Sequence, residues 1–236
     1  MKYETITSKD NKKIKELASF SPKSDFFIAE GFHLVEMALE TDSAEAIFSL
    51  KEYESNVPTY LVNGELMKKI SFTMNPEGIL AKCPKKNPKP ISSNKILILD
   101  GVSDPGNVGT LIRTALSFGY FDIALSGGSV DPYNPKCVQA SQGAIFKTNI
   151  IKGIDSSFLK ELKKQGYKVI GTSLKSSVPL SSINKEEKIA IILGNEARGI
   201  SEAFEKEAVT NVKIEMDNID SLNVAIAGGI IMYELR

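Results

Sequence analysis

The sequence is poor in the residues from which metal and redox sites are built. Its 236 residues include two cysteines, Cys83 and Cys137, and one histidine, His33. The cysteines lack the spacing of metal ligands, so a site built from cysteine and histidine is disfavoured and no bound metal is expected. Unpaired thiols of this kind are typical of a reducing cytosol.

Long apolar runs and net charge are also missing. No stretch approaches the roughly 20 apolar residues of a membrane span, and the polar start MKYETITSKDNKK has no apolar signal core. We therefore expect a cytoplasmic protein without membrane contact. The 29 basic and 29 acidic residues cancel, so a nucleic-acid surface would require local clustering of charge.

Several common catalytic motifs are absent as well. No G-x-G-x-x-G follows a strand pattern and no G-x-x-x-x-G-K-[ST] occurs, which disfavours a dinucleotide enzyme of the usual kind and a P-loop NTPase. There is no G-x-S-x-G. His33 lies outside the half of the chain that carries the motifs described below, so a hydrolytic triad is not expected.

Arginine is scarce, and its positions are informative. Of the 29 basic residues, three are arginines (Arg113, Arg198 and Arg236) and 26 are lysines. A lysine-biased genome explains the ratio, but it does not explain why two of the three lie inside the strings described below. Arginine supplies a rigid bidentate fork for phosphate or carboxylate. We therefore interpret Arg113 as functional, whereas Arg198 can equally be a surface residue.

A lysine- and proline-rich stretch divides the chain. Residues 82–95, KCPKKNPKPISSNK, have almost no apolar content and predict an extended linker. Residues 1–81 alternate helix and strand patterns, which indicates a small α/β unit. Residues 96–236 alternate strands with helices, which is typical of a mainly parallel sheet. The expected strands are 26–31, 46–50, 59–63, 78–84, 95–102, 121–127, 146–151, 168–173, 188–194 and 212–216, and the expected helices are 11–20, 33–40, 65–71, 108–118, 135–144, 158–165, 202–208 and 222–236.

Three short strings follow expected strands in the downstream unit: NVGTLIRTA (107–115), GNEARG (194–199) and SLNVAIAGG (221–229). Proteins of the α/β class build their sites from polar groups that Gly-rich turns present at the ends of strands. In the first string, Asn107 is placed to cap the following helix. Gly109 keeps the first turn open to a ligand, and the side chain of Arg113 can reach back toward the site. A plain capped strand-turn-helix explains the same residues.

The second and third strings add further polar groups. Gly194 lets a ligand approach the end of a strand closely, and Glu196, between two glycines, is an unusual choice for a solvated turn. Ser221 is placed to cap the last helix, with Asn223 in its first turn. The small residues that follow let another backbone come close, and a capped packing helix accounts for them too.

In this order and at these strand ends, the strings resemble the three signature motifs of the SpoU-type (TrmH-like) RNA ribose 2′-O-methyltransferases of the SPOUT class. The likeness runs from about Lys95 to the C-terminus. Upstream, SKDNKKIKELASF and FFIAEGFHLVEMAL resemble the substrate-binding domain of that family. The resemblance implies methyl transfer from S-adenosylmethionine to RNA, with ribosomal RNA favoured over transfer RNA. It also implies a trefoil knot in the C-terminal domain and a homodimer with the site near its interface.

Residue by residue, the resemblance implies a catalytic set of Asn107, Arg113, Glu196, Ser221 and Asn223. It implies cofactor contacts, largely through backbone groups, at Thr172, Gly194, Ile214 and Leu222. The sequence departs from the family pattern at Ala197, Arg198 and Glu215, which leaves the shape of those loops open. Lys9, Lys12 and Lys13, which lie near Lys15, form a candidate RNA surface together with the linker lysines. A solvated helix face explains these lysines equally well.

The implied mechanism depends mainly on alignment of the two reactants, which can supply on the order of 7–11 kcal/mol. Because a guanidinium normally stays protonated, we expect Arg113 to hold the adjacent RNA phosphate and stabilise the developing alkoxide. The family resemblance casts it as the group acting on the ribose hydroxyl. Asn107 would orient Arg113 or the ribose, Glu196 would hold that geometry, and Ser221 and Asn223 would complete a polar wall.

Three alternatives remain open at this point. The chain could be a transfer RNA ribose methyltransferase, a methyltransferase of related fold that modifies a base, or a non-catalytic RNA-binding protein that keeps the fold. Intact polar residues in all three strings argue against the last of these.

Overall fold

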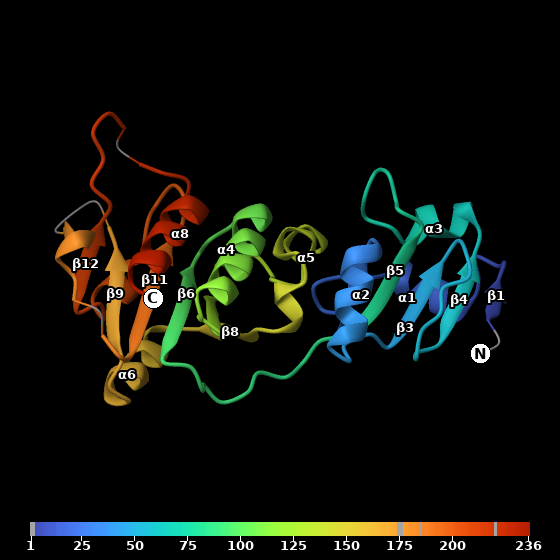
Figure 1. The fold of residues 1–236 in the computed structure, drawn as a ribbon, viewed down its shortest axis with the longest axis horizontal. Coiled ribbons are helices and arrows are strands. Elements are labelled where there is room, and N and C mark those ends of the chain that lie inside the picture. Colours follow the sequence, from blue (N-terminus) through green and yellow to red (C-terminus); the bar gives the residue numbers. More distant parts are fainter. Residues whose placement is uncertain (1–2, 174–176, 185, 220) are drawn as a thin grey trace.

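The computed structural model describes residues 3–173, 177–184, 186–219 and 221–236. These residues form two α/β units joined by an extended segment, which runs along one side of the molecule in Figure 1. The N-terminal unit lies at the right of that view and the C-terminal unit at the left, with α5 and α2 facing each other between them. None of the described helices is long and apolar enough to span a membrane.

The N-terminal unit is built on a five-stranded mixed sheet with the order β1-β4-β3-β5-β2. Its strands are β1 (Glu4–Ile6), β2 (Phe26–Glu30), β3 (Ala46–Ser49), β4 (Thr59–Val62) and β5 (Ile79–Pro84). Its helices are α1 (Lys12–Ala18), α2 (Phe32–Glu40) and α3 (Gly64–Ile70). The amide side chains of Asn11 and Asn63 accept hydrogen bonds from the first turns of α1 and α3, which fixes where these helices begin.

The C-terminal unit is built on a seven-stranded sheet with the order β10-β12-β9-β11-β6-β7-β8, and every pairing in it is parallel. Its strands are β6 (Lys95–Asp100), β7 (Asp122–Ser126), β8 (Asn149–Ile154), β9 (Lys168–Thr172), β10 (Val178–Pro179), β11 (Ile189–Gly194) and β12 (Thr210–Lys213). Its helices are α4 (Pro105–Ser117), α5 (Pro135–Ser141), α6 (Ser156–Lys164), α7 (Glu202–Glu205) and α8 (Val224–Glu234), with short 3-10 turns η1 (Ala144–Phe146) and η2 (Leu180–Ser182). The expected mainly parallel α/β sheet is therefore confirmed.

The central strands of this sheet are almost completely buried. All six residues of β11 are buried, and so are five of the six in β6. Strands covered on both faces are characteristic of parallel sheets with helices on either side. The segment of chain between β9 and β11 and the region before α8 contain undescribed residues, so the expected knot stays a prediction.

Several expected elements are shifted or shorter. The strand expected at 146–151 begins at Asn149 because Phe146 closes the η1 turn. The helix expected at 202–208 ends at Glu205. Strands β1 and β10 were not predicted, because they are too short to carry a period-two pattern. Strand β5 continues to Pro84, three residues beyond the expected end of the N-terminal unit.

The two units share an apolar contact. The ring of Phe27 on β2 lies 4.9 Å from that of Tyr133 and 5.8 Å from that of Phe146, measured between ring centroids. Gly143 comes so close to Met37 of α2 that a Cβ at this position would lie 2.8 Å from the Met37 side chain. Aromatic pairs of this kind stabilise an interface beyond the area that they bury.

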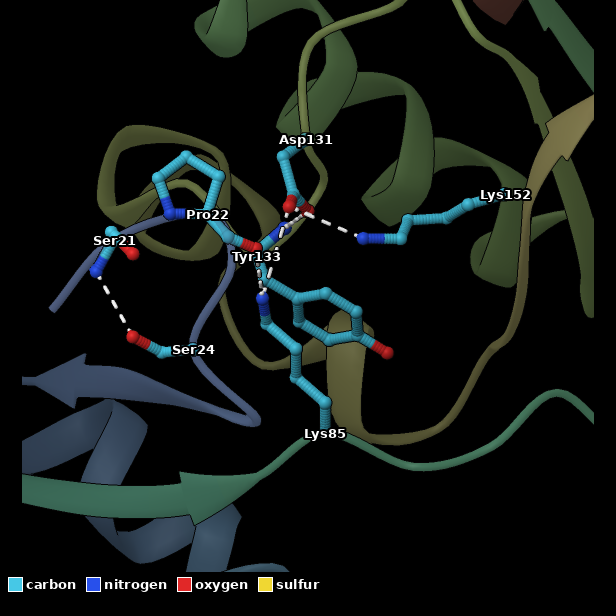
Figure 2. A network of polar contacts seen from close by, with 7 residues as sticks. All are labelled: Ser21, Pro22, Ser24, Lys85, Asp131, Tyr133 and Lys152. Atoms are coloured by element: carbon cyan, nitrogen blue, oxygen red, sulfur yellow. Dashed lines mark hydrogen bonds and ion pairs between the residues drawn. The ribbon is translucent and has the colours of Figure 1, made fainter.

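Polar contacts reinforce this junction, as Figure 2 shows. Lys85 Nζ donates to the carbonyl oxygen of Pro22 (2.9 Å) and lies 3.8 Å from an Asp131 carboxylate oxygen. Lys152 pairs with the same oxygen at 3.2 Å. Both ammonium groups lie over the ring of Tyr133. Lys85 therefore connects the end of the N-terminal sheet to the C-terminal unit.

Candidate functional site

The site predicted from the three strings lies at the carboxyl edge of the C-terminal sheet. Strands β6 and β11 are neighbours there, with Asp100 opposite Gly194. The first string follows β6 and the second follows β11, so both emerge at the same point of the edge. The third string leads into α8, which packs against both α4 and β11. Parallel sheets place binding sites at this edge.

The Glu196 carboxylate is the centre of this arrangement. One oxygen accepts hydrogen bonds from Asn107 Nδ2 (3.1 Å) and from the Asp104 backbone N–H (3.3 Å). The other accepts from the hydroxyl and the backbone N–H of Ser103 at 3.2 and 3.4 Å. A side chain of the second string therefore holds the turn between β6 and α4 in place.

Asn107 connects Glu196 to the third string. Its Oδ1 accepts a hydrogen bond of 2.9 Å from Asn223 Nδ2. Asn223 Oδ1 in turn accepts from the backbone N–H groups of Ala225 and Ile226 at the start of α8. A carboxylate only accepts hydrogen bonds, so the Asn107 amino group must face Glu196 and its oxygen must face Asn223. The three side chains thus form a hydrogen-bonded series in which Asn223 donates to Asn107 and Asn107 donates to Glu196.

The hydrogen bonds decide the charge state of Glu196. Burial raises the pKa of its carboxyl, but the hydrogen bonds from Asn107 and from the backbone of this turn outweigh that effect and bring the pKa below its usual value of 4.5. Glu196 is therefore ionised at neutral pH. Because its oxygens already accept several hydrogen bonds, it is suited to hold other groups in position and poorly suited to accept a proton from a substrate.

Two expected helix caps are wrong by a few residues. Asp104, not Asn107, caps α4, and its side chain accepts from the Asn107 backbone N–H at 2.8 Å. This frees the Asn107 amide for Glu196 and Asn223. At α8, Asn223 is the cap and the exposed Ser221 lies two residues before it. Both corrections have the same cause, because Asp, Asn and Ser are similarly good hydrogen-bond acceptors at the start of a helix. Residue type alone therefore does not decide which of two nearby candidates is the cap.

Gly109 has a different role from the one expected, and Gly194 has a close backbone neighbour that was not predicted. A Cβ at Gly109 would lie 2.4 Å from the Cys137 carbonyl oxygen, so this glycine permits close packing of α4 on α5 and does not open the helix to a ligand. A Cβ at Gly194 would lie 2.2 Å from backbone atoms of Gly199 and Ile200. The backbone that approaches the end of β11 is therefore that of its own loop, which an isolated bridge between Asn195 and Gly199 closes.

Gly228 of α8 permits close packing, although side chains approach it and not the backbone that was expected. A Cβ at Gly228 would lie 2.5 Å from side-chain atoms of both Leu111 on α4 and Leu193 on β11. Helix α8 therefore lies directly over the strand that ends in the second string. This packing positions the start of α8, and with it Asn223, next to Asn107 of α4.

Arg113 lies on α4 but outside the hydrogen-bonded group. Its side chain is exposed, and among the described residues no carboxylate pairs with it. It follows Asn107 by six residues, which rotates it by about 120° around the helix. Glu196 is therefore hydrogen-bonded to Asn107 and does not contact Arg113 through a hydrogen bond or ion pair among the described residues. Arg198 is also exposed, in the loop after Glu196.

The four residues expected to hold a cofactor gather along the same edge. Thr172 and Gly194 end β9 and β11, and Ile214 directly follows β12. These three strands are neighbours in the sheet. Leu222 lies half-buried in the turn before α8. The Thr172 hydroxyl donates to the Ile192 carbonyl oxygen at 2.9 Å. Parts of the adjoining loops, residues 174–176 and 220, lie outside the described residues.

The candidate RNA lysines lie at the far end of the other unit. Lys9 and Lys12 are exposed, whereas the Lys13 ammonium lies 4.8 Å from the ring centroid of Tyr60. Lys15 pairs with Asp10 at 2.8 Å. These lysines lie in α1 or just before it, so they are close together in the chain.

Three further residues that shape the site were not predicted from the sequence. Asn195 Nδ2 donates to the Gly101 carbonyl oxygen at 2.8 Å, and Asp100 accepts from the Ser201 backbone N–H at 2.7 Å. Ser103 contacts Glu196 as described above. All three lie inside or beside the first two strings, so their polarity at strand ends was the available signal.

Two family models match the chain. Residues 94–233 match the SpoU rRNA methylase family, and residues 11–81 match the MRM3-like substrate binding domain. The first match includes all three strings, and the second includes most of the N-terminal sheet and its helices.

Relatives and solved structures cover nearly the whole chain. The sequence is 32% identical over 244 residues to the 23S rRNA (guanosine(2553)-2′-O)-methyltransferase RlmP of Bacillus subtilis, with 98% of each chain covered. The AdoMet-bound rRNA methyltransferase from Sinorhizobium meliloti superposes with a TM-score of 0.86 at 27% identity, covering 99% of this chain and 97% of that one. The SpoU methyltransferase AviRb from Streptomyces viridochromogenes shares the fold, with a TM-score of 0.85 at 18% identity, covering 95% of this chain and 97% of that one.

Proposed function

Because the chain belongs to the SpoU rRNA methylase family, we propose that it transfers a methyl group from S-adenosylmethionine to a ribose 2′-hydroxyl of ribosomal RNA. The observation that carries the proposal is the hydrogen-bonded chain Glu196–Asn107–Asn223. It joins all three strings at the sheet edge where the family's chemistry is expected. A protein that kept only the fold would not require this directional chain of side chains.

The described residues along this edge suit S-adenosylmethionine. Thr172, Gly194 and Ile214 stand at or directly after the ends of three adjacent strands, where the ladder hydrogen bonds of the sheet end. Half-buried Ile214 and Leu222 supply apolar surface for an adenine ring, and few polar contacts are then needed to orient it. When bound, this cofactor supplies an activated methyl group on a sulfonium. The chain's own residues must align the ribose with it.

Each member of the predicted catalytic set has a distinct role in this proposal. Glu196 keeps Asn107 and the Ser103–Asp104 turn in place. Asn107 and Asn223 present fixed polar atoms to the ribose, and Ser221 extends this polar wall. Arg113, exposed on the outer face of α4, holds the RNA phosphate next to the methylated ribose and stabilises the developing alkoxide.

The N-terminal unit is the substrate-binding part in this proposal. We assign it to the part of the chain that ends with β5 at Pro84, followed by the linker and by the methyltransferase domain, whose sheet begins with β6 at Lys95. Lys9, Lys12 and Lys13 supply its positive surface near α1. Ribosomal RNA is the proposed substrate because RlmP, which covers both units, is named for 23S rRNA. The reaction is accordingly assigned to the cytoplasm.

A homodimer completes the proposal. Helix α8 is apolar on nearly all sides, and Ile226, Ile230 and Tyr233 leave 55%, 41% and 52% of their surface exposed. Their spacing of four and three residues places them on one face. A helix that is apolar all round is normally buried, so a second copy of the chain is the proposed partner for this face.

The experiment is a methyl-transfer assay with the purified full-length protein, labelled S-adenosylmethionine and ribosomal RNA. After complete nuclease digestion, the label is expected in a 2′-O-methylnucleoside. Label in a methylated base would favour the base-modifying alternative. Transfer to transfer RNA alone would replace the proposed substrate, and binding without transfer would favour the non-catalytic alternative.

A further inference from the structure

A cavity of about 230 Å³ lies between the two units, away from the site described above. Its floor is apolar and consists of Phe27, Tyr133, Phe146 and Ile150. The linker covers one side, and residues at the start of β7 and β8 form the other. Sites that enclose drug-sized ligands measure about 300–1,000 Å³, so this cavity suits part of a larger molecule.

The rim of the cavity is positively charged. Lys86, Lys89 and Lys147 line it, and among the residues that the structure describes no carboxylate pairs with any of them. Lys86 Nζ donates to the Ser43 hydroxyl at 2.9 Å. Phe121 stands beside these lysines with 49% of its surface exposed.

The one acidic residue in the lining, Asp122, leaves a net charge of +2, because the lining holds three lysines and one carboxylate. Asp122 is fully buried, and its oxygens accept from Asn149 Nδ2 (2.6 Å) and from the backbone N–H groups of Ser92 and Ser93 (3.1 and 2.8 Å). Asn149 also holds the linker through the backbone of Lys89. The polar groups at the base therefore fix the linker, and the lysines remain available to a ligand.

Ammonium groups without a carboxylate partner and aromatic side chains in one cavity match one ligand chemistry. A nucleotide carries a phosphate for the lysines and a base that stacks on an aromatic ring. We propose that this cavity binds an unpaired nucleotide of the substrate RNA, with its phosphate at the lysine rim and its base against Phe121 and the apolar floor. The identity of this ligand as RNA rests on the function proposed above.

The position of the cavity sets where along the RNA this contact lies. The cavity is at the amino ends of β7 and β8, whereas Glu196 and Asn107 lie at the carboxyl edge. A strand of six residues spans about 20 Å, so the bound nucleotide is distinct from the methylated one. The cavity includes Phe27 and Ser43 of the N-terminal unit, so this nucleotide also contacts both units.

The test measures RNA binding by fluorescence anisotropy, with the full-length protein and a labelled single-stranded RNA 12-mer of mixed sequence. Lys147→Glu is expected to weaken binding. It should also reduce the slope of log Kd against log salt concentration by about 0.7 or more. Phe121→Ala is expected to weaken it about five-fold or more through lost stacking. Lys51→Glu makes the same charge change at the other end of the N-terminal sheet, beyond β3, and should have a smaller effect. Thermal melting verifies that each variant is folded.

Wild-type affinity and salt dependence in both cavity variants would overturn the assignment, even where the wild-type protein methylates RNA normally. Weakened binding in both variants supports it, even where the methyl-transfer assay fails. Adenosine monophosphate serves as a second probe. If the two variants lose affinity for this free nucleotide while their RNA affinity is unchanged, the site takes a free nucleotide and the RNA assignment is overturned.

Discussion

Asn107 Nδ2 lies 3.1 Å from a carboxylate oxygen of Glu196, although 89 residues separate the two in sequence. This contact joins the helix after β6 to the loop after β11 and gives the Asn107 amide a fixed orientation. Since the Asn107 oxygen then receives the Asn223 amino group, one carboxylate determines the direction of the whole chain of side chains.

Arg113→Ala is expected to abolish methyl transfer while binding of S-adenosylmethionine survives, because Arg113 is exposed on α4 and the four proposed cofactor residues lie on other elements. Arg113→Lys should also be poorly active, since a point charge does not replace the bidentate fork. Calorimetry gives the cofactor affinity, and a labelled-methyl assay gives the rate. Lost cofactor binding in the alanine variant, or near-normal turnover in the lysine variant, would contradict this role.

Glu196→Gln should make stability less dependent on pH. The pKa of Glu196 in the folded protein is lower than its usual value of 4.5. The ionised form therefore stabilises the fold above about pH 4.5, and this contribution is lost as the pH falls through the folded-state pKa. Urea unfolding of both proteins should show the wild type more stable at pH 7, with a difference that shrinks toward pH 3. An unchanged difference at both pH values would contradict the assigned charge state.

Gly109→Ala should destabilise the protein by about 1–3 kcal/mol, because the new methyl group meets the Cys137 carbonyl oxygen and the Ala140 side chain. The matched control is Gly64→Ala, also in a helix, where a Cβ has no neighbour within 4 Å. That change should be neutral or stabilise by up to about 1 kcal/mol. Chemical denaturation compares the two. Equal effects would show that α4 and α5 do not pack this closely.

Ile226→Asp combined with Ile230→Asp should convert the proposed dimer into a monomer, since it places two charges on the exposed apolar face of α8. Sedimentation velocity at several concentrations measures this. The control is Ile219→Asp, which alters an exposed isoleucine outside the helix. A monomeric wild-type protein would contradict the proposed partner for α8.

Much of the fold followed from local patterns, because continuous apolar runs such as that of β11 and the alternation of strands with helices are properties of short segments. The roles of individual residues followed less well. The wrong cap at Asn107 arose because Asp104 offers an equivalent acceptor three residues earlier. The expected role of Gly109 was wrong because the Cys137 backbone that packs against it is placed by tertiary structure, and the close approach of Gly199–Ile200 to Gly194 could not be predicted for the same reason.

For the site, too, the location followed from local patterns, whereas the contacts between residues did not. The polar residues of the three strings marked the correct sheet edge, and Glu196, Asn107 and Asn223 do meet there. Their pairing could not be predicted, since it depends on the register of β6 against β11 and on the packing of α8 at Gly228. The cavity beneath the linker was likewise not predictable, because its walls come from both units.

The most direct test maps 2′-O-methyl groups in the ribosomal RNA of cells that lack this gene and of the same cells complemented with the wild-type or the Asn107→Ala protein. We expect one 2′-O-methylated nucleotide to disappear on deletion and to return with the wild-type protein. With Asn107→Ala, which breaks the link between Glu196 and Asn223, a rate loss on the order of 10²-fold should leave that nucleotide largely unmodified. A methylation pattern of ribosomal RNA that is the same with and without the gene would contradict the proposed function.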